Sequence, residues 1–104
     1  MDQFSEDGIL TWQYEGGSLG LFVHVTTHCA TKMIDSLSID NDLITIMLED
    51  TASAEADCLC KFRQAYYFLV DEFKEIKVKC FFKSIKSDSF LLVIDRKLQL
   101  VNEN

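Results

Sequence analysis

Proline is absent from this chain, and glycine occurs only four times. A sequence so poor in both residues contains no proline- or glycine-rich linker, and it shows no internal repeat and no low-complexity segment. Its 104 residues suffice for one domain, which buries roughly 60–70% of the surface that its unfolded chain exposes. We therefore predict a single domain over residues 1–104.

Long apolar runs are also absent. The longest runs of large apolar residues, Tyr66–Val70 and Phe90–Ile94, hold five residues each, whereas a membrane-spanning helix needs about 20. The first eight residues carry three carboxylates and lack the basic and apolar regions of a secretory signal peptide. These absences predict a cytoplasmic or nuclear protein that does not enter a membrane.

Basic residues are scarce in the first half of the chain. Residues 1–57 carry a net charge of −10, residues 58–104 carry +3, and the whole chain carries −7. Phosphate contacts dominate nonspecific nucleic-acid binding, so a net acidic chain is a poor candidate for it. A bipolar chain can instead pair with a charged protein partner or with a second copy of itself.

Motifs for catalysis and cofactor binding are missing. The sequence contains no glycine-rich phosphate-binding loop. Asp40-Asn41-Asp42 lacks the glycine and the distal glutamate of a calcium-binding EF-hand, and nothing places the pairs Glu49-Asp50 and Asp71-Glu72 beside a cleft. We predict no catalytic residue, no cofactor and no enzymatic activity.

Histidine and cysteine provide the right ligand types for a metal ion, but at unsuitable spacings. On a strand, His24 and His28 lie about 13 Å apart, too far for one ion. On the helix expected below, Cys58 and Cys60 diverge by about 200° around the axis. Zinc sites typically use Cys-x₂₋₄-Cys pairs in loops, so we predict no metal site.

The four cysteines sit within apolar patterns, where free cysteine is commonly buried. The start of the chain gives no indication of an oxidising compartment. Cys29 also follows His28, but adjacent residues of a strand point to opposite faces and cannot form a nucleophile–base pair. We therefore predict reduced core thiols at all four positions, which are Cys29, Cys58, Cys60 and Cys80.

Alternating apolar and polar residues predict strands in most of the chain. Glu15-Gly16-Gly17-Ser18 and Asp40-Asn41-Asp42 have the residues of hairpin turns, because glycine and asparagine tolerate positive φ. The predicted strands are Ile9–Tyr14, Leu19–Cys29, Met33–Ile39, Leu43–Glu49, Ile76–Lys83, Phe90–Arg96 and Leu98–Val101.

Helical spacing interrupts this pattern between Ser53 and Lys74. Apolar residues recur there at steps of three and four, and Ser53 is a suitable N-cap. We therefore predict an α+β fold, with one long helix inserted after the fourth strand of a mostly antiparallel sheet or sandwich of about seven strands. The helical stripe comprises Leu59, Phe62, Tyr66, Leu69 and Phe73.

This order of elements resembles two known architectures. One is the β-sandwich head of the end-joining and centriolar scaffold superfamily, in which strands flank a helical segment. The other is one repeat of a sliding-clamp subunit. Without the third strand, the order resembles that of an OB-fold. The first resemblance implies a scaffold protein, and the other two imply a nucleic-acid-binding module.

Two strands present candidate binding residues on the faces opposite their main apolar rows. Lysines surround an aromatic ring on one of them, an arrangement that can protect a sheet edge, bind a protein or hold a nucleic acid. Exposed aromatic rings on strands also mark protein interfaces. The predicted partner-binding residues are Phe22, His24, Lys77, Lys79, Phe81 and Lys83.

Together these features predict a non-enzymatic interaction or scaffold module, a small subunit or adaptor of a larger intracellular assembly, with a protein partner or self-association. One alternative is an OB-like or clamp-like nucleic-acid-binding module that uses the lysine-lined strand. A second is an acidic inhibitor that mimics nucleic acid. It would use Asp35, Asp40, Asp42, Glu49 and Asp50.

Overall fold

Seven β-strands make up the fold in the computed structural model, which describes residues 8–70 and 75–100. The first four strands form two hairpins, and the last two form a third. In chain order the strands are β1 (Ile9–Glu15), β2 (Ser18–His28), β3 (Met33–Asp40), β4 (Leu43–Asp50), β5 (Leu59–Leu69), β6 (Glu75–Lys83) and β7 (Leu91–Gln99).

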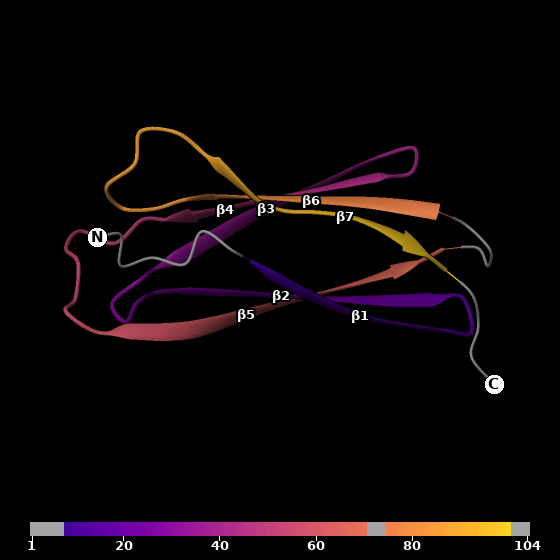
Figure 1. Cartoon of the computed structure of the whole chain (residues 1–104), viewed down its shortest axis with the longest axis horizontal. Helices are drawn as coiled ribbons and strands as arrows, with labels where there is room; N and C mark the ends of the chain where they lie inside the picture. Colours follow the sequence, from indigo (N-terminus) through magenta and orange to yellow (C-terminus); the bar gives the residue numbers. More distant parts are fainter. Residues whose placement is uncertain (1–7, 71–74, 101–104) are drawn as a thin grey trace.

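The strands lie in two sheets that stack as the two layers of a sandwich (Figure 1). Sheet A has the strand order β1-β2-β5, and sheet B has the order β3-β4-β6-β7. Neighbouring strands are antiparallel except β4 and β6, which run parallel. Parallel neighbours need a long crossover connection, and here it passes through β5 in the other sheet.

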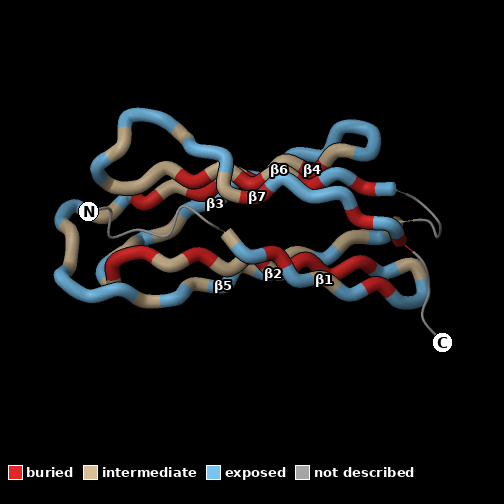
Figure 2. Tube along the Cα trace, in the orientation of Figure 1, coloured by how far each residue is buried: buried red, intermediate tan, exposed pale blue. Residues whose placement is uncertain are grey.

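The core fills the space between the layers, and less and more exposed residues alternate along most strands, whereas β3 is exposed from its second residue to its last (Figure 2). This follows from the two-residue period of a strand, which sends successive side chains to opposite faces. β2, the central strand of sheet A, contributes Leu19, Leu21, Val23 and Val25 to the core. β6, an inner strand of sheet B, contributes Ile76, Val78, Cys80 and Phe82. The alternation predicted for these two strands is confirmed.

Two predicted hairpin turns are also confirmed. Gly16 and Gly17 connect β1 to β2 with φ angles of 61° and 83°. Positive φ at both central residues is the requirement of a two-residue type I′ turn, which suits the twist of the strands it joins. Asn41, between β3 and β4, has a φ of 55°.

The predicted helix is wrong, and the fold is all-β rather than α+β. No helix occurs among residues 8–70 and 75–100. The segment from Leu59 to Leu69 forms strand β5, which pairs with β2 over its whole length. The first residues of the predicted helix form the β4–β5 loop, and residues 71–74 lie outside the described chain.

The helical pattern was misleading because positions four apart share a face in a strand as well as in a helix. Phe62 and Tyr66 satisfy both periods. Phe68 and Val70 fall outside the helical stripe, but they complete a strand face, and both pack against the core with Phe62 and Tyr66. Phenylalanine, tyrosine and valine also favour strands.

Three further predictions change with the topology. The resemblances to the scaffold head, the clamp repeat and the OB-fold lose their basis, because each required the inserted helix. The predicted strands Phe90–Arg96 and Leu98–Val101 are one strand, β7, up to Gln99; Val101 lies outside the described residues. β6 lies between β4 and β7, so its lysines do not protect a sheet edge.

Candidate functional site

The outer face of sheet A contains an aromatic cluster, which we define as Phe22, Arg63 and Tyr67. Phe22 points outward from the central strand β2, and the other two residues point outward from β5. The rings of Phe22 and Tyr67 meet edge to face, with centroids 5.9 Å apart. The Arg63 guanidinium carbon lies 5.2 Å from the Phe22 ring centroid, within the range of a cation–π contact.

Gly20 gives the two rings room to lie close to the sheet. It pairs with Tyr67 across the β2–β5 ladder. A Cβ atom at Gly20 would lie 3.3 Å from the Tyr67 ring and 3.4 Å from the Phe22 ring, so a larger residue would push the rings outward. An open groove of about 500 Å³ passes Gly20; its lining comprises Trp12, Gln13, Tyr14, Glu15, Ser18, Gly20 and Tyr67.

Further apolar side chains extend the aromatic cluster across sheet A. Tyr67 is 69% exposed and Leu69, two residues further along the same face of β5, is 88% exposed. Ile9 on β1 and Leu59 on β5 belong to the same outer face and are also exposed. Single exposed apolar residues are common, but Tyr67 and Leu69 are neighbours on one strand face and together expose a surface that another molecule can cover.

His24, one of the predicted binding residues, lies beside the aromatic cluster. It pairs with Ile9 on β1 and with Arg63 on β5. Its Nε2 atom lies 3.2 Å from the Thr11 hydroxyl oxygen, a hydrogen-bonding distance. His24 and Phe22 are therefore neighbours on one surface, as the sequence predicted from their shared strand face.

The four remaining predicted binding residues lie on the outer face of sheet B. Because the two sheets stack core to core, this surface and the aromatic cluster lie on opposite sides of the molecule (Figure 1). The structure therefore does not bring the six predicted residues together. Those on sheet B are Lys77, Lys79, Phe81 and Lys83, which alternate with the buried residues of β6.

The lysines of β6 have different surroundings. Lys83 pairs with Glu49 on β4 at 3.6 Å. Lys79 faces Asp95 across the β6–β7 ladder, while Lys77 faces Lys97. Phe81, half-buried, pairs with Met47 on β4. This surface is mixed in charge around a small apolar centre, with its basic part at Lys77 and Lys97.

The carboxylates proposed as a nucleic-acid mimic do not form one surface. Asp50 is buried in the molecule. Asp35 accepts a hydrogen bond from Tyr66, and Glu49 pairs with Lys83. Asp40 and Asp42 lie at the β3–β4 turn. Asp35, Glu49 and Asp50 are thus already engaged within the domain.

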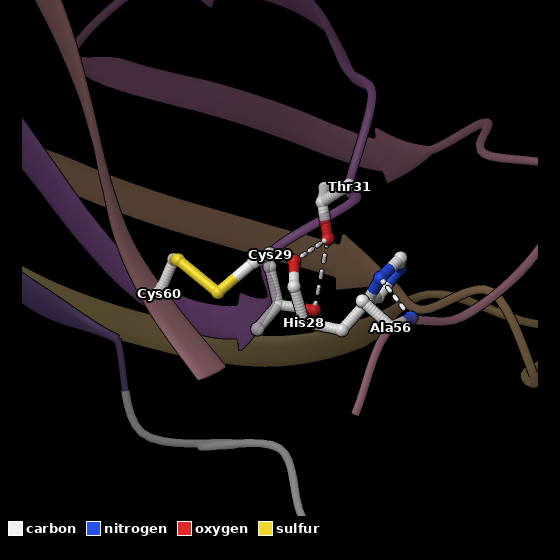
Figure 3. The surroundings of a disulfide bond; sticks show 6 residues. His28, Cys29, Thr31, Ala56 and Cys60 are labelled. Atoms are coloured by element: carbon white, nitrogen blue, oxygen red, sulfur yellow. Dashed lines mark hydrogen bonds between the residues drawn. A yellow bond between two sulfur atoms is a disulfide. The ribbon is translucent and has the colours of Figure 1, made fainter. Parts of the chain in front are cut away.

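A buried polar pair lies where β2 and β4 end. His28 Nε2 and Asp50 Oδ2 form a hydrogen bond between side chains that are 1% and 0% exposed. His28 Nδ1 accepts a hydrogen bond from the Ala56 backbone N–H at 3.1 Å, as Figure 3 shows. Because Nδ1 accepts, the proton of the neutral ring is on Nε2, which donates it to Asp50.

Asp50 accepts several further bonds at its carboxylate. The backbone N–H groups of Lys32 and Ala52 donate to Oδ1 at 3.1 and 2.9 Å, and the Thr31 hydroxyl lies 3.3 Å from Oδ2. Burial alone would raise the pKa of Asp50, but the bonds from Ala52, His28 and Lys32 outweigh it and lower the pKa below the ordinary value of 3.8. Through these bonds, both ends of the β2–β3 connection are held against the end of β4 and against the β4–β5 loop. The His28–Asp50 pair therefore has a structural role.

The cysteines depart most from prediction. Cys29 and Cys60 form a disulfide (Figure 3), so these two are not reduced thiols. Cys58 is an exposed free thiol, and only Cys80 is the buried free thiol that was predicted. Burial raises the pKa of Cys80 to about 12, which leaves it protonated and unreactive at neutral pH.

Three sulfur atoms nevertheless meet at this end of the sandwich. Those of Cys29, Cys58 and Cys60 all lie within 4.8 Å of one another. The predicted divergence of Cys58 and Cys60 rested on the helix and is wrong. Residues two apart share a face of an extended segment. Two of the three sulfurs are bonded to each other and cannot act as thiolate ligands in this state. The sequence predicts this cluster only if residues 59–69 are interpreted as a strand that pairs antiparallel with Leu19–Cys29.

The fold and the surface together define a two-layer β-sandwich domain with an exposed aromatic face. No protein-family model, no curated protein and no solved structure matches the chain. Among the described residues, no helix is long and apolar enough to cross a membrane.

Proposed function

We propose that this domain is a non-enzymatic protein-interaction module, a small subunit or adaptor of a larger assembly, and that it binds its partner through the outer face of sheet A. The observation that supports this most directly is the aromatic cluster around Gly20. Tyrosine, phenylalanine and arginine are enriched at the centres of protein interfaces, and here Tyr67, Phe22 and Arg63 lie together on one sheet face, with Tyr67 also lining the groove beside Gly20.

The charges on this face indicate the chemistry of the partner. Lys61 and Arg63 point outward from β5, and Glu15 is the carboxylate at the far end of β1. A partner segment that places an apolar side chain over Gly20 and a carboxylate near Arg63 would complement both properties. We therefore propose a protein partner with an apolar side chain flanked by acidic residues.

The test compares two exposed apolar residues on opposite faces. Tyr67→Ser alters the aromatic cluster, and Leu92→Ser removes a side chain that is 47% exposed on sheet B. Proteins captured by the wild-type domain are identified and then purified, and their affinity for both variants is measured by calorimetry. We expect at least a tenfold loss for Tyr67→Ser, since an interface anchor contributes about 2 kcal/mol or more.

Leu92→Ser provides the control and should keep the wild-type affinity. A purified partner that binds both variants equally would contradict the placement on sheet A. A domain that stays monomeric in light scattering and retains no purified partner would contradict the interaction module itself. Loss of self-association on Tyr67→Ser would identify a second copy of the chain as the partner.

A nucleic-acid-binding module is the second candidate. It is favoured by the position of Lys77 opposite Lys97, on the same face of sheet B as Phe81. Lys77→Glu and Lys97→Glu should then weaken binding to single-stranded oligonucleotides in fluorescence anisotropy, and added salt should weaken it further. Lys61→Glu on the other face is the matched control.

The cellular location stays a prediction. The sequence favours the cytoplasm or nucleus, whereas disulfides persist in oxidising compartments and are rare in those two. Alkylating the protein inside intact cells, before lysis, would record the redox state of Cys29 and Cys60 where the protein resides. A disulfide trapped in this way would place the domain outside the reducing compartments.

A further inference from the structure

The sulfur cluster at the end of β2 and β5 contains one disulfide and one free thiol. We propose that Cys29, Cys58 and Cys60 form a thiol–disulfide exchange site, in which the exposed Cys58 thiolate attacks the Cys29–Cys60 disulfide at Cys29. The domain then has two disulfide isomers, Cys29–Cys60 and Cys29–Cys58. This inference is independent of the protein partner proposed above.

The backbone already holds Cys29 and Cys58 as neighbours. In the β2–β5 ladder, Thr27 pairs with Cys60 and His28 with Leu59, so one further step places Cys29 opposite Cys58. A backbone hydrogen bond from Cys29 N–H to the Cys58 carbonyl at 2.9 Å continues the ladder to this step. Directly opposite residues of antiparallel strands have Cα atoms about 4.5–5.5 Å apart, which is within the range for a disulfide.

The observed disulfide uses the other neighbour of Cys29. Its Cα atom lies 4.9 Å from that of Cys60. Cys29 is therefore within bonding range of two cysteines on the facing segment. Because all three sulfurs lie within 4.8 Å of one another, rotation of the Cys58 side chain is enough to bring its sulfur onto Cys29 without a change of strand register.

The exchange is balanced within the domain. The Cys58 thiol loses its proton to water, and its sulfur bonds to Cys29 as the Cys29–Cys60 bond breaks. Cys60 leaves as a thiolate and takes up a proton from water. One disulfide and one thiol are present before and after the step, so neither an oxidant nor a reductant is required.

The two isomers differ in what they show to solvent. In the Cys29–Cys60 isomer the free thiol is Cys58, which is exposed. In the other isomer the free thiol is Cys60, which is only partly exposed. Small thiols and disulfides, such as the two forms of glutathione, would react with the first isomer faster than with the second. Exchange therefore moves the free thiol between an exposed position, Cys58, and a partly exposed one, Cys60.

Two single variants test the site, because each removes one of the two cysteines that compete for Cys29. Cys60→Ser leaves Cys29 and Cys58, while Cys58→Ser leaves Cys29 and Cys60. Each folded variant is equilibrated in a buffer of reduced and oxidised glutathione and labelled with N-ethylmaleimide, and its mass is measured. Cys80 is fully buried, and it should be labelled only after unfolding.

We expect both variants to take up no label while folded, because each forms its own disulfide. Cys60→Ser with two labelled thiols, under conditions in which Cys58→Ser has none, would overturn the proposal. Circular dichroism of both variants checks that they keep the strand content of the wild type.

The wild-type protein tests the exchange even if Cys60→Ser does not fold. It is incubated with a trace of reduced glutathione, quenched with acid to stop exchange, unfolded and labelled. After the remaining disulfide is reduced, trypsin releases residues 33–61, which hold Cys58 and Cys60, and fragmentation locates the label. We expect the label on Cys58 in most molecules and on Cys60 in a measurable minority. A label on Cys58 and Cys80 alone, at all incubation times, would overturn the exchange.

Discussion

Tyr66 on β5 donates a hydrogen bond from its hydroxyl to the Asp35 carboxylate on β3, at 2.7 Å. The two residues belong to different sheets, so this bond joins the layers along the side on which β3 and β5 are both edge strands. Burial, followed by the bond to Asp35, raises the pKa of Tyr66. The phenol consequently stays protonated, and keeps its donor, across the physiological pH range.

Removing this hydroxyl tests the contact. Tyr66→Phe should lower the free energy of unfolding by about 1 kcal/mol, because a hydrogen bond to a charged group in a partly exposed position is lost. Urea unfolding measures the change. Tyr67→Phe is the matched control on the next residue, where the ring is 69% exposed. An equal loss in both variants would show that the Tyr66 hydroxyl adds nothing specific.

Asp50 should make the domain sensitive to acid. Its pKa is lowered on folding from an ordinary value of 3.8, so the folded state favours the ionised carboxylate. That contribution is complete above the ordinary value and disappears as the pH falls through the lower pKa of the folded state. Asp50→Asn should cost about 1–3 kcal/mol at pH 7, and its stability should fall less steeply below pH 4 than that of the wild type.

Urea unfolding at pH 7, 5 and 3 measures both effects. Glu49→Gln is the control, because Glu49 is a partly exposed neighbour whose pair with Lys83 is 3.6 Å long. It should cost under about 1 kcal/mol. A parallel loss of stability in the wild type and Asp50→Asn between pH 5 and 3 would refute the role given to Asp50.

Reducing the disulfide should destabilise the domain substantially. Cys29 and Cys60 are 31 residues apart in sequence, and closing a loop of this length in the unfolded chain corresponds to about 3–4 kcal/mol. The difference in unfolding midpoint with and without a reductant such as dithiothreitol measures it. Cys58→Ser should respond to the reductant as the wild type does. Identical midpoints in the two conditions would show that the disulfide does not stabilise the fold.

Two leucines of sheet A should differ strongly in their effect on stability. Leu21 on β2 is 0% exposed, and Leu69 at the end of β5 is 88% exposed. Leu21→Ala should cost about 2–5 kcal/mol because it leaves a cavity in the core. Leu69→Ala should change stability by less than about 0.5 kcal/mol. A comparable loss for both, measured by thermal unfolding, would contradict the assignment of the inner and outer faces.

The strands of this fold were largely predictable from the sequence, and the fifth was not. In β2 and β6, buried apolar residues alternate with residues that are polar apart from Gly20, Phe22 and Phe81, and this two-residue period is typical of a strand alone. In β5 both faces carry large apolar residues, since Tyr67 and Leu69 point outward and Phe62 and Tyr66 inward. Local periodicity cannot distinguish such a segment from a broad helical stripe, and pairing with β2 decides the outcome.

The candidate site depended on that same segment. Phe22 and His24 were identified from their strand, but Arg63 and Tyr67 were assigned to a helix, so the aromatic cluster was not foreseen. The disulfide was missed for the same reason. Cys29 and Cys60 become neighbours only when β5 lies against β2. His28 and Asp50 belong to different sheets, and their contact depends on how the layers are stacked.

The disulfide between β2 and β5 also has a consequence for folding while the chain is being synthesised. Sheet A is complete once residue 69 has been synthesised, whereas sheet B then has only β3 and β4 of its four strands. Until β6 and β7 emerge from the ribosome, the inner face of sheet A is only partly covered. A Cys29–Cys60 bond formed at that stage would hold β2 and β5 in register through an interval in which the nascent chain exposes apolar surface and can aggregate.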